Sequence, residues 1–206
     1  MPCVGNDVVD LKEPANAGKS KDSRFLKKIL TDAEIEFVKN AENPDTALWS
    51  FWACKETAYK VIKKSFPGAA FTPRRWQTVF TGFQLEYSER EVFIPGKDGV
   101  FIRLFSNSDY IHCLGADVLA VLDKLDWRVE ILPEEETNPS LFSRHCLARI
   151  LAKHLSLNFD QIKIIRKRQN GELQPPRVYV GGREIDIDVS LSHDGRFSAY
   201  AFNATR

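Results

Sequence analysis

The sequence lacks the features that mark secreted, membrane-spanning or nucleic-acid-binding proteins. Its four cysteines are widely spaced and form no CxxC pair, so neither a disulfide framework nor a zinc site is predicted. No apolar run approaches the roughly 18 residues of a transmembrane helix, and the N-terminus has no basic region followed by a long apolar segment. Lys plus Arg (29) almost cancel Asp plus Glu (28), so no strong field favours nucleic acid. We therefore expect a reduced, cytoplasmic protein with neither a membrane nor a nucleic acid as partner.

Several common catalytic signatures are also missing. The chain has no Walker A sequence, no GxGxxG and no HExxH, and Ser192 has no GxSxG elbow around it. These absences argue against the common nucleotide-binding folds, zinc hydrolases and serine hydrolases. What remains is an ordinary globular composition, because 206 residues with 43% hydrophobic content can bury a core as one large domain or two small lobes.

Hydrophobic periodicity gives the same order of elements in both halves of the chain. The first half predicts a strand at residues 3–10 with a turn or bulge beside it at residues 5–7, helices at about 32–40 and 44–66, and an antiparallel meander over 78–122. The second predicts a strand at 127–132, an acidic linker at 133–136, a helix at about 140–155, strands at 162–165, 177–180 and 185–192, turns at Asn170-Gly171 and Gly181-Gly182, and a last strand at 197–202. The pattern indicates an α+β protein with two related lobes.

The segment FWACKETAYK, residues 51–60, has the pattern of a buried helix but carries charges in its middle. Lys55 projects into the apolar arc, Glu56 falls among aromatic side chains, and Lys60 lies one turn beyond Glu56. Burying such charges is costly unless they are paired. One interpretation is a Glu56–Lys60 ion pair with Lys55 extending its amine to solvent. The other is a metal-binding carboxylate flanked by lysines for an anionic substrate.

Two further stretches add polar groups. GNDVVDL supplies Asp7 and Asp10, although an Asp after Gly-Asn most often belongs to a turn. VSLSHDG places Ser192 and His193 at the end of an apolar strand, where a histidine is more often structural or on the surface. An Mg²⁺ site usually takes only one or two carboxylates and leaves other positions to water and phosphate oxygens. Asp7 and Glu56 would therefore be sufficient for a metal site.

In this order, the three stretches resemble the motifs of the 4′-phosphopantetheinyl transferase superfamily. GNDVVDL is similar to its G-x-D-I motif and FWACKETAYK to W-x-x-K-E-[AS]-x-x-K, while FLKKILTDAEIEFV resembles F-x-x-R-x-[FL]-T-x-x-E of the holo-acyl-carrier-protein synthase branch. Residues 140–176 and VSLSHDG resemble the N-terminal lobe of the larger surfactin-synthetase-activating type, where that lobe comes first. The resemblance implies a pseudo-dimeric α+β fold in permuted order. Lobes at 1–125 and 126–206 would each pack helices on a mainly antiparallel sheet, with the site between them.

The resemblance also implies an activity. Members of the family transfer the phosphopantetheinyl arm of coenzyme A to a serine of a carrier protein, release 3′,5′-ADP and use Mg²⁺. The implied partner is an apo acyl or peptidyl carrier protein of fatty acid, polyketide or nonribosomal peptide biosynthesis. Because one chain would hold both lobes, we expect a monomer.

The motifs imply a role for each matching residue. Glu56 would accept the proton of the incoming serine, and Lys60 would neutralise the pyrophosphate. The expected metal ligands are Asp7 and Glu56, with Asp10 as a further candidate. The expected contacts to coenzyme A come from Lys55, Lys60, Arg149, Ser192 and His193.

Two departures from the family pattern affect these expectations. Val9 stands where the larger type has a second metal carboxylate, so we expect water as the third ligand. Glu172 stands where the family has the lysine of a G-K-P turn, which weakens coenzyme A contact unless the basic residues 166–168 offset the loss. This second departure keeps open a non-catalytic coenzyme A or carrier-protein binding module. A phosphohydrolase that uses Asp7 and Asp10 is a further alternative.

Overall fold

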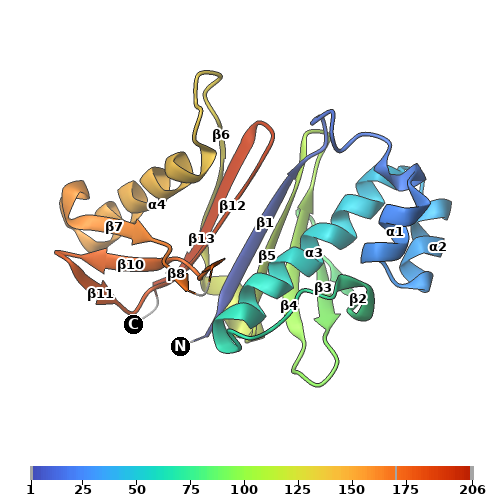
Figure 1. Ribbon diagram of the computed structural model, residues 1–206, viewed down its shortest axis with the longest axis horizontal. Helices are drawn as coiled ribbons and strands as arrows, with labels where there is room; N and C mark the ends of the chain where they lie inside the picture. The colour runs from blue at the N-terminus through green and yellow to red at the C-terminus, as the bar shows by residue number, and fades with distance from the viewer. Residues whose placement is uncertain (1, 170, 205–206) are drawn as a thin grey trace.

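The computed structural model describes residues 2–169 and 171–204, and it mixes helices with antiparallel sheets as an α+β protein does (Figure 1). The helices are α1 (Ser23–Ile29), α2 (Asp32–Asn40), α3 (Pro44–Ser65) and α4 (Pro139–Leu155). Short 3₁₀ turns lie at Lys19–Lys21, Pro73–Arg75, Leu119–Lys124 and Phe159–Gln161. None of the helices among the described residues is long and apolar enough to cross a membrane.

The strands fall into four antiparallel groups. Those of the N-terminal sheet are β1 (Val4–Asp10), β2 (Gln77–Phe83), β3 (Ser88–Phe93), β4 (Val100–Ser106) and β5 (Tyr110–Ala116). Those of the C-terminal sheet are β6 (Asp126–Ile131), β12 (Asp188–Asp194) and β13 (Phe197–Asn203). The remaining strands are β7 (Ile162–Ile165), β10 (Arg177–Val180) and β11 (Arg183–Ile185), and the hairpin strands β8 (Arg168–Gln169) and β9 (Glu172–Leu173). The turn predicted at Asn170-Gly171 includes Asn170, which lies outside the described residues.

The helix boundaries follow local capping chemistry. Thr31 Oγ1 accepts from the Glu34 N–H, and the Glu34 carboxylate accepts from the Thr31 N–H, which confirms the predicted capping box at the start of α2. The side chain of Asn43 caps α3, and Pro44 occupies the first turn, where its missing N–H costs nothing. The predicted extent of both helices is confirmed to within a residue or two.

The N-terminal sheet has the strand order β1-β5-β4-β3-β2, and β1 joins it at β5. The meander predicted over 78–122 is confirmed from β2 to β5, but its predicted end falls in the 3₁₀ turn Leu119–Lys124. Residues 5–7, expected to turn or bulge, instead lie inside the straight strand β1. Gly5 has a different role here. A Cβ at this position would collide with the carbonyl oxygen of Thr57, so the glycine lets β1 pack directly against α3.

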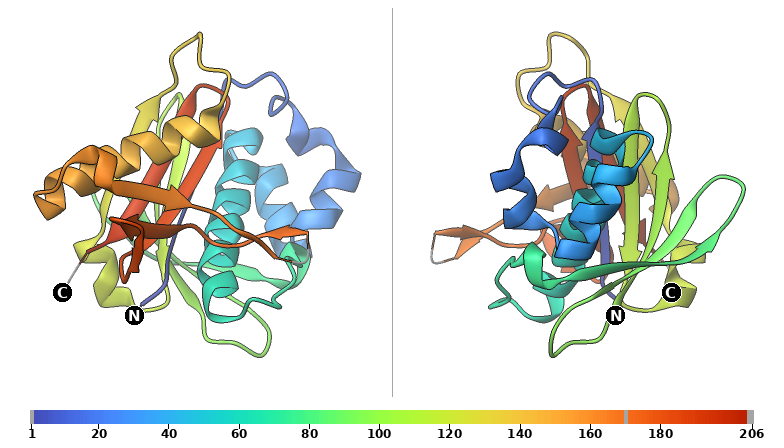
Figure 2. Two further views of the ribbon diagram at one scale, coloured as in Figure 1. Left: turned by 60° about the vertical axis from the view of Figure 1, so that its left-hand side comes forward. Right: turned by 90° about the vertical axis from the view of Figure 1, so that its right-hand side faces the viewer.

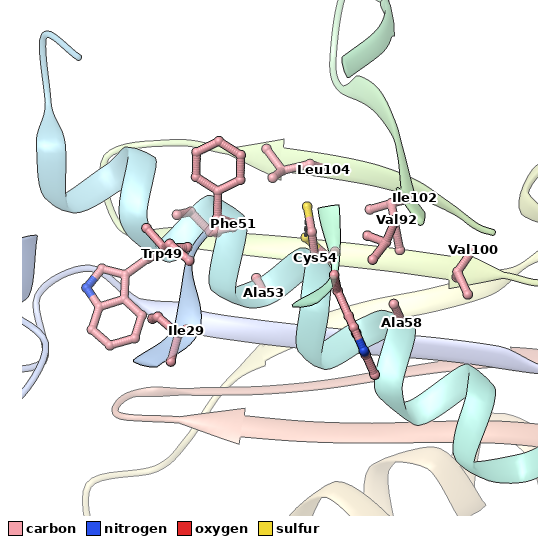
Figure 3. Close-up of a cluster of buried hydrophobic side chains, with 14 of the residues drawn as sticks. Ile29, Trp49, Phe51, Ala53, Cys54, Ala58, Val92, Val100, Ile102 and Leu104 are labelled. Carbon is pink, nitrogen blue, oxygen red and sulfur yellow. Dashed lines mark hydrogen bonds between the residues drawn. The ribbon is translucent and has the colours of Figure 1, made fainter. Parts of the chain in front are cut away.

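The largest hydrophobic core lies between α3 and the N-terminal sheet (Figure 3). Cys54 and Ala58 of α3 lie near Val92 and Ile102 of the strands, while Trp49 lies beside Ile29 at the other end of the cluster, and all of these side chains are buried. Complete burial of one large apolar side chain stabilises a fold by about 1.5–3 kcal/mol. This core therefore fixes α3 firmly against β1 and β5.

The C-terminal sheet has the order β12-β13-β6, and α4 packs on it through a second core around Leu147, Leu151 and Tyr200. Strands β11-β10-β7 form a small sheet beside α4. The hairpin of β8 and β9 extends from this side of the molecule toward α3 (Figure 2). Elements from both halves of the chain therefore meet along α3.

Strands β1 and β12 run side by side but are joined by side chains (Figure 1). Four N–H groups of β1 donate to four side-chain oxygens of β12: Val4 to Asp188, Asn6 to Ser190, Val8 to Ser192 and Asp10 to Asp194, at 2.6–3.2 Å. We call these four bonds the side-chain ladder. Alternate residues of a strand face the same side, so polar groups at every second position of β12 match alternate N–H groups of β1. The ladder holds VSLSHDG beside GNDVVDL.

Candidate functional site

The site is built around Asp7, in the middle of β1. Its Oδ1 accepts hydrogen bonds from Lys60 Nζ at 2.8 Å and from Ser192 Oγ at 2.7 Å. Lys60 comes from α3 and Ser192 from the side-chain ladder, so three elements fix one carboxylate. Only 7% of Asp7 is exposed, which keeps this carboxylate in a defined position.

Glu56 projects from α3 near the same carboxylate. Burial, and then the negative charge of Asp7, raise the pKa of Glu56 to about 7, while the nearby Lys60 acts in the opposite direction. The expected Glu56–Lys60 ion pair is not among the ion pairs of the described residues, because Lys60 pairs with Asp7 instead. Glu56 can therefore exchange a proton near neutral pH.

Asp7, Glu56 and His193 line one pocket of about 480 Å³, which we call the carboxylate pocket. Its other walls are mainly aromatic or come from the loop after β1: Val8, Val9, Ala15, Asn16, Lys19, Phe25, Trp49, Trp52 and Asp194. Burial, and then Lys60, lower the pKa of His193, although Asp194 and Asp7 oppose the shift. The imidazole of His193 is therefore predominantly neutral at neutral pH and can donate or accept a hydrogen bond.

The two carboxylates of this pocket suit a hard divalent cation. Their mutual repulsion contributes to the raised pKa of Glu56, and a cation between them would remove that cost. Among the described residues no group of three or more His, Cys, Asp and Glu side chains could hold a metal. Mg²⁺ nevertheless needs only one or two protein carboxylates when water and phosphate oxygens supply the rest. The donor set of Asp7 and Glu56 therefore fits Mg²⁺.

A second pocket of about 290 Å³ adjoins this site through Lys60, and we call it the lysine pocket. Its walls come from α3, from β12 and from the segment around β9: Tyr59, Lys60, Lys63, Lys64, Arg166, Glu172, Leu173, Pro175, Pro176, Ser190 and Leu191. Lys60 lines this pocket and bonds Asp7, so an anion here would lie one side chain away from the carboxylates. The arrangement suits a ligand that carries several phosphates.

Comparison with known proteins agrees with these motifs. A family model described as the 4′-phosphopantetheinyl transferase superfamily matches residues 3–109. The chain belongs to this superfamily. The matched region contains Asp7, Glu56 and Lys60, whereas Ser192 and His193 lie outside it.

Three relatives that match this chain are each named holo-[acyl-carrier-protein] synthase. A holo-[acyl-carrier-protein] synthase of Leptospira biflexa serovar Patoc is 30% identical over 103 residues, which cover 50% of this chain and 77% of the relative. One of Caldanaerobacter subterraneus subsp. tengcongensis is 31% identical over 94 residues, 46% of this chain and 68% of the relative. One of Chloroherpeton thalassium is 30% identical over 76 residues, 37% of this chain and 60% of the relative. These alignments cover at most half of this chain.

Lys55 of the superfamily motif does not reach either pocket. Its amine has no exposed surface and donates to Glu34 Oε2, to the Ile29 carbonyl at 3.0 Å and to the Pro73 carbonyl at 2.9 Å. The expected contact with coenzyme A therefore has no physical basis, because all three N–H groups are used inside the core. Lys55 ties α3 to α2 and to the segment that precedes β2.

Asp10 and Arg149 also lie apart from the two pockets. Arg196 donates to both carboxylate oxygens of Asp10 at 2.7 and 2.8 Å, and the backbone N–H groups of Lys12 and Arg196 add two more bonds. Burial alone would raise the pKa of Asp10, but these bonds lower it to about 2. Asp10 is therefore a structural anchor rather than a metal ligand. Arg149 lies on the exposed face of α4 and lines neither pocket.

Sequence reasoning missed Lys64. Its amine, on a side chain that is 5% exposed, donates to Asp188 Oδ2 at 2.7 Å and to the carbonyls of Val4 and Val189, so it joins α3, β1 and β12 at the wall of the lysine pocket. Lys64 lies four residues after Lys60, on the same face of α3. That spacing was the available signal, but the acceptors come from strands distant in sequence.

Proposed function

We propose that this protein transfers the 4′-phosphopantetheine arm of coenzyme A to a serine of an apo carrier protein and releases 3′,5′-ADP. The observation that carries the proposal is the convergence of Asp7, Glu56 and Lys60 at the junction of two pockets. Membership of the superfamily and the names of the relatives support it.

Glu56 is the group that moves the proton in this proposal. The serine oxygen forms a bond to the phosphorus that carries pantetheine, the bridging P–O bond of the pyrophosphate breaks, and 3′,5′-ADP leaves with the electron pair. The serine must lose its proton in the same step. The carboxylate of Glu56, directly or through a water, can take that proton and release it afterwards.

The other groups hold charge and position in this proposal. Mg²⁺, when bound by Asp7 and Glu56, would neutralise charge that develops on the pyrophosphate. Lys60 holds Asp7 in place and presents a partly exposed amine toward the lysine pocket, where the nucleotide end of coenzyme A would lie. His193 lines the carboxylate pocket from β12 and can hydrogen-bond a phosphate oxygen.

The proposal includes the pseudo-dimeric arrangement and the monomeric state. The GNDVVDL and VSLSHDG motifs come from one chain, and the side-chain ladder already joins them. A second copy is not needed to complete the site.

Phe25 and Trp52 line both the carboxylate pocket and a neighbouring groove with Lys28, Arg74 and Arg75. This groove offers apolar and positive contacts to an acidic carrier protein.

The test is direct transfer. The protein is incubated with coenzyme A, Mg²⁺ and a panel of apo acyl and peptidyl carrier proteins, and intact mass spectrometry follows the mass of each carrier. We expect at least one carrier to gain the mass of phosphopantetheine, and chelation of Mg²⁺ to prevent the gain. A folded protein that binds coenzyme A but modifies none of the carriers would count against the proposal.

A non-catalytic binding module is the second candidate, favoured by Glu172. This carboxylate lies in the lysine pocket, where the family pattern has a lysine, and pairs with Lys63. Glu56→Gln separates the candidates. Loss of transfer with coenzyme A binding kept supports the enzyme, whereas binding without transfer in the unmodified protein supports the module.

A further inference from the structure

Three lysines that line the lysine pocket each form an ion pair with a carboxylate, and the three pairs differ in how firmly they are held. The pairs are Lys60–Asp7 at 2.8 Å, Lys64–Asp188 at 2.7 Å and Lys63–Glu172 at 3.0 Å. The first two carboxylates are almost buried, and each accepts a second hydrogen bond. Asp7 accepts from Ser192, and Asp188 accepts from the Val4 N–H. These two pairs belong to the scaffold.

The Lys63–Glu172 pair is different. Two thirds of the Glu172 side chain is exposed (66%), and its carboxylate has Lys63 as the only hydrogen-bond partner recorded among the described residues. Lys63 itself is 12% exposed and lines the pocket. A carboxylate held by a single ion pair at the surface gains little from that contact. Glu172 can therefore leave Lys63 at small cost.

Glu172 lies where loss of this weak ion pair would open the lysine pocket to an anion. The hairpin of β8 and β9 extends toward α3 (Figure 2). Glu172 belongs to β9, and its carboxylate contacts Lys63 of α3 and lines the pocket between elements from both halves of the chain. Arg166 lines the same wall, where its Nε donates to the Gln174 carbonyl at 3.0 Å and no carboxylate pairs with it among the described residues. Removal of Glu172 would leave Lys63 and Arg166 together as an open anion site.

We infer that Glu172 is a built-in competitor for the phosphate groups of the ligand: its carboxylate occupies Lys63 and is displaced when a phosphate enters the lysine pocket. The inference rests on the proposed function, because it assigns this pocket to the nucleotide end of coenzyme A. Glu172 thus sets affinity for the anionic ligand and acts as a positioning residue. It touches none of the reacting atoms.

The test is calorimetric binding of two probes, coenzyme A and adenosine 3′,5′-bisphosphate, to the full chain. Glu172→Gln keeps the size of the side chain and removes its charge, and we expect it to lower Kd for both probes about 5-fold. Lys63→Met should raise Kd by a similar factor. In the Lys63→Met background Glu172→Gln should tighten binding less, because its partner is already gone.

Glu184→Gln is the matched control. Glu184 is also exposed and lies near a cation, Arg177 at 3.7 Å, but it is on β11 and does not line the pocket. Glu184→Gln changes the net charge of the protein by the same amount as Glu172→Gln. If Glu172→Gln tightens binding no more than Glu184→Gln, the inference is overturned. Weaker binding in Glu172→Gln would also overturn the inference, because the Lys63–Glu172 ion pair would then help to hold the ligand.

The readouts distinguish this inference from the proposed function. If the unmodified protein neither binds coenzyme A nor modifies a carrier protein, the proposed function fails. The inference, which depends on it, then fails too. If it transfers phosphopantetheine normally while Glu172→Gln and the unmodified protein have the same Kd, only the inference fails. Circular dichroism melting of each variant confirms that differences in Kd arise from folded protein.

Discussion

The two lysines of the FWACKETAYK segment lie on the same helix, five residues apart, in contrasting surroundings. Lys55 has no exposed surface, and its three hydrogen bonds all end on groups of the core. Lys60 keeps about a quarter of its side chain exposed and divides its bonds between Asp7 and the Asn6 carbonyl. Lys55 is buried in the scaffold, whereas Lys60 lines the lysine pocket and bonds Asp7, which lines the carboxylate pocket.

Strand β1 repeats this contrast with carboxylates. Asp10 accepts four bonds from Arg196 and Lys12, and its pKa is lowered to about 2. Asp7 lines the carboxylate pocket beside Glu56 and raises the pKa of that neighbour. In each motif, one charge is fully compensated inside the fold. The other charge faces a pocket where a ligand can complete its environment, and this difference separates structural from functional residues.

Glu56→Gln should give the largest effect on the functional side of this comparison. It removes the proposed proton acceptor, so we expect transfer to an apo carrier protein to fall about 10³-fold. Stability should not fall, because the substitution removes a charge that Asp7 disfavours. Intact mass spectrometry measures transfer and urea unfolding measures stability. Retained transfer would show that Glu56 does not carry the chemistry.

Lys55→Met should give the largest effect on the structural side. It leaves the buried carboxylate of Glu34 without its cation, so we expect a loss of about 3–5 kcal/mol in the free energy of unfolding, measured in urea. The double variant Lys55→Met/Glu34→Gln should recover part of that loss. Transfer per folded molecule should change little. A stable Lys55→Met protein without activity would reverse the assignment.

Lys60→Met should have a smaller effect, and on activity rather than stability. It removes a cation beside the proposed pyrophosphate position, so we expect transfer to fall about 10²-fold. Urea unfolding should change less than in Lys55→Met, because Lys60 is partly exposed and Asp7 keeps its hydrogen bond from Ser192. Equal destabilisation by the two substitutions would remove the distinction between the lysines.

The smallest expected effect is a pH dependence of stability that arises from Asp10. Its pKa is about 2 in the folded protein and 3.8 in the reference state, so the unfolded chain binds more protons between these values. The stabilisation of about 2 kcal/mol is complete above pH 3.8 and is lost as the pH falls toward 2. Asp10→Asn should be less stable at pH 6 and should lose less stability on acidification. Identical slopes from pH 5 to 3 would contradict this anchor.

The sequence predicted the local structure well. The capping box at Thr31, the limits of α3 and the meander from β2 to β5 all depend on signals within a few residues, and the structure confirms them. The turn expected at residues 5–7 was wrong because Gly5 allows close contact with Thr57, a residue far away in the sequence. A glycine that allows a helix to approach closely cannot be told from a glycine in a turn by the local sequence.

The candidate site was predictable only in part for the same reason. Asp7 and Glu56 lie in recognisable motifs, and both line the carboxylate pocket. Lys55 is also in a motif, but its partner Glu34 belongs to α2, and spacing along α3 cannot reveal a partner on another helix. The side-chain ladder joins residues 184 positions apart, so neither Ser190 nor the Ser192–Asp7 bond could be inferred from local pattern.

The most direct test of the central claim is anomalous diffraction from crystals grown with coenzyme A and Mn²⁺ in place of Mg²⁺. We predict one manganese peak within bonding distance of carboxylate oxygens from both Asp7 and Glu56, with a coenzyme A phosphate on the same ion and Lys55 still bound to Glu34. A peak on Asp10, or coenzyme A bound away from Lys60, would contradict the account.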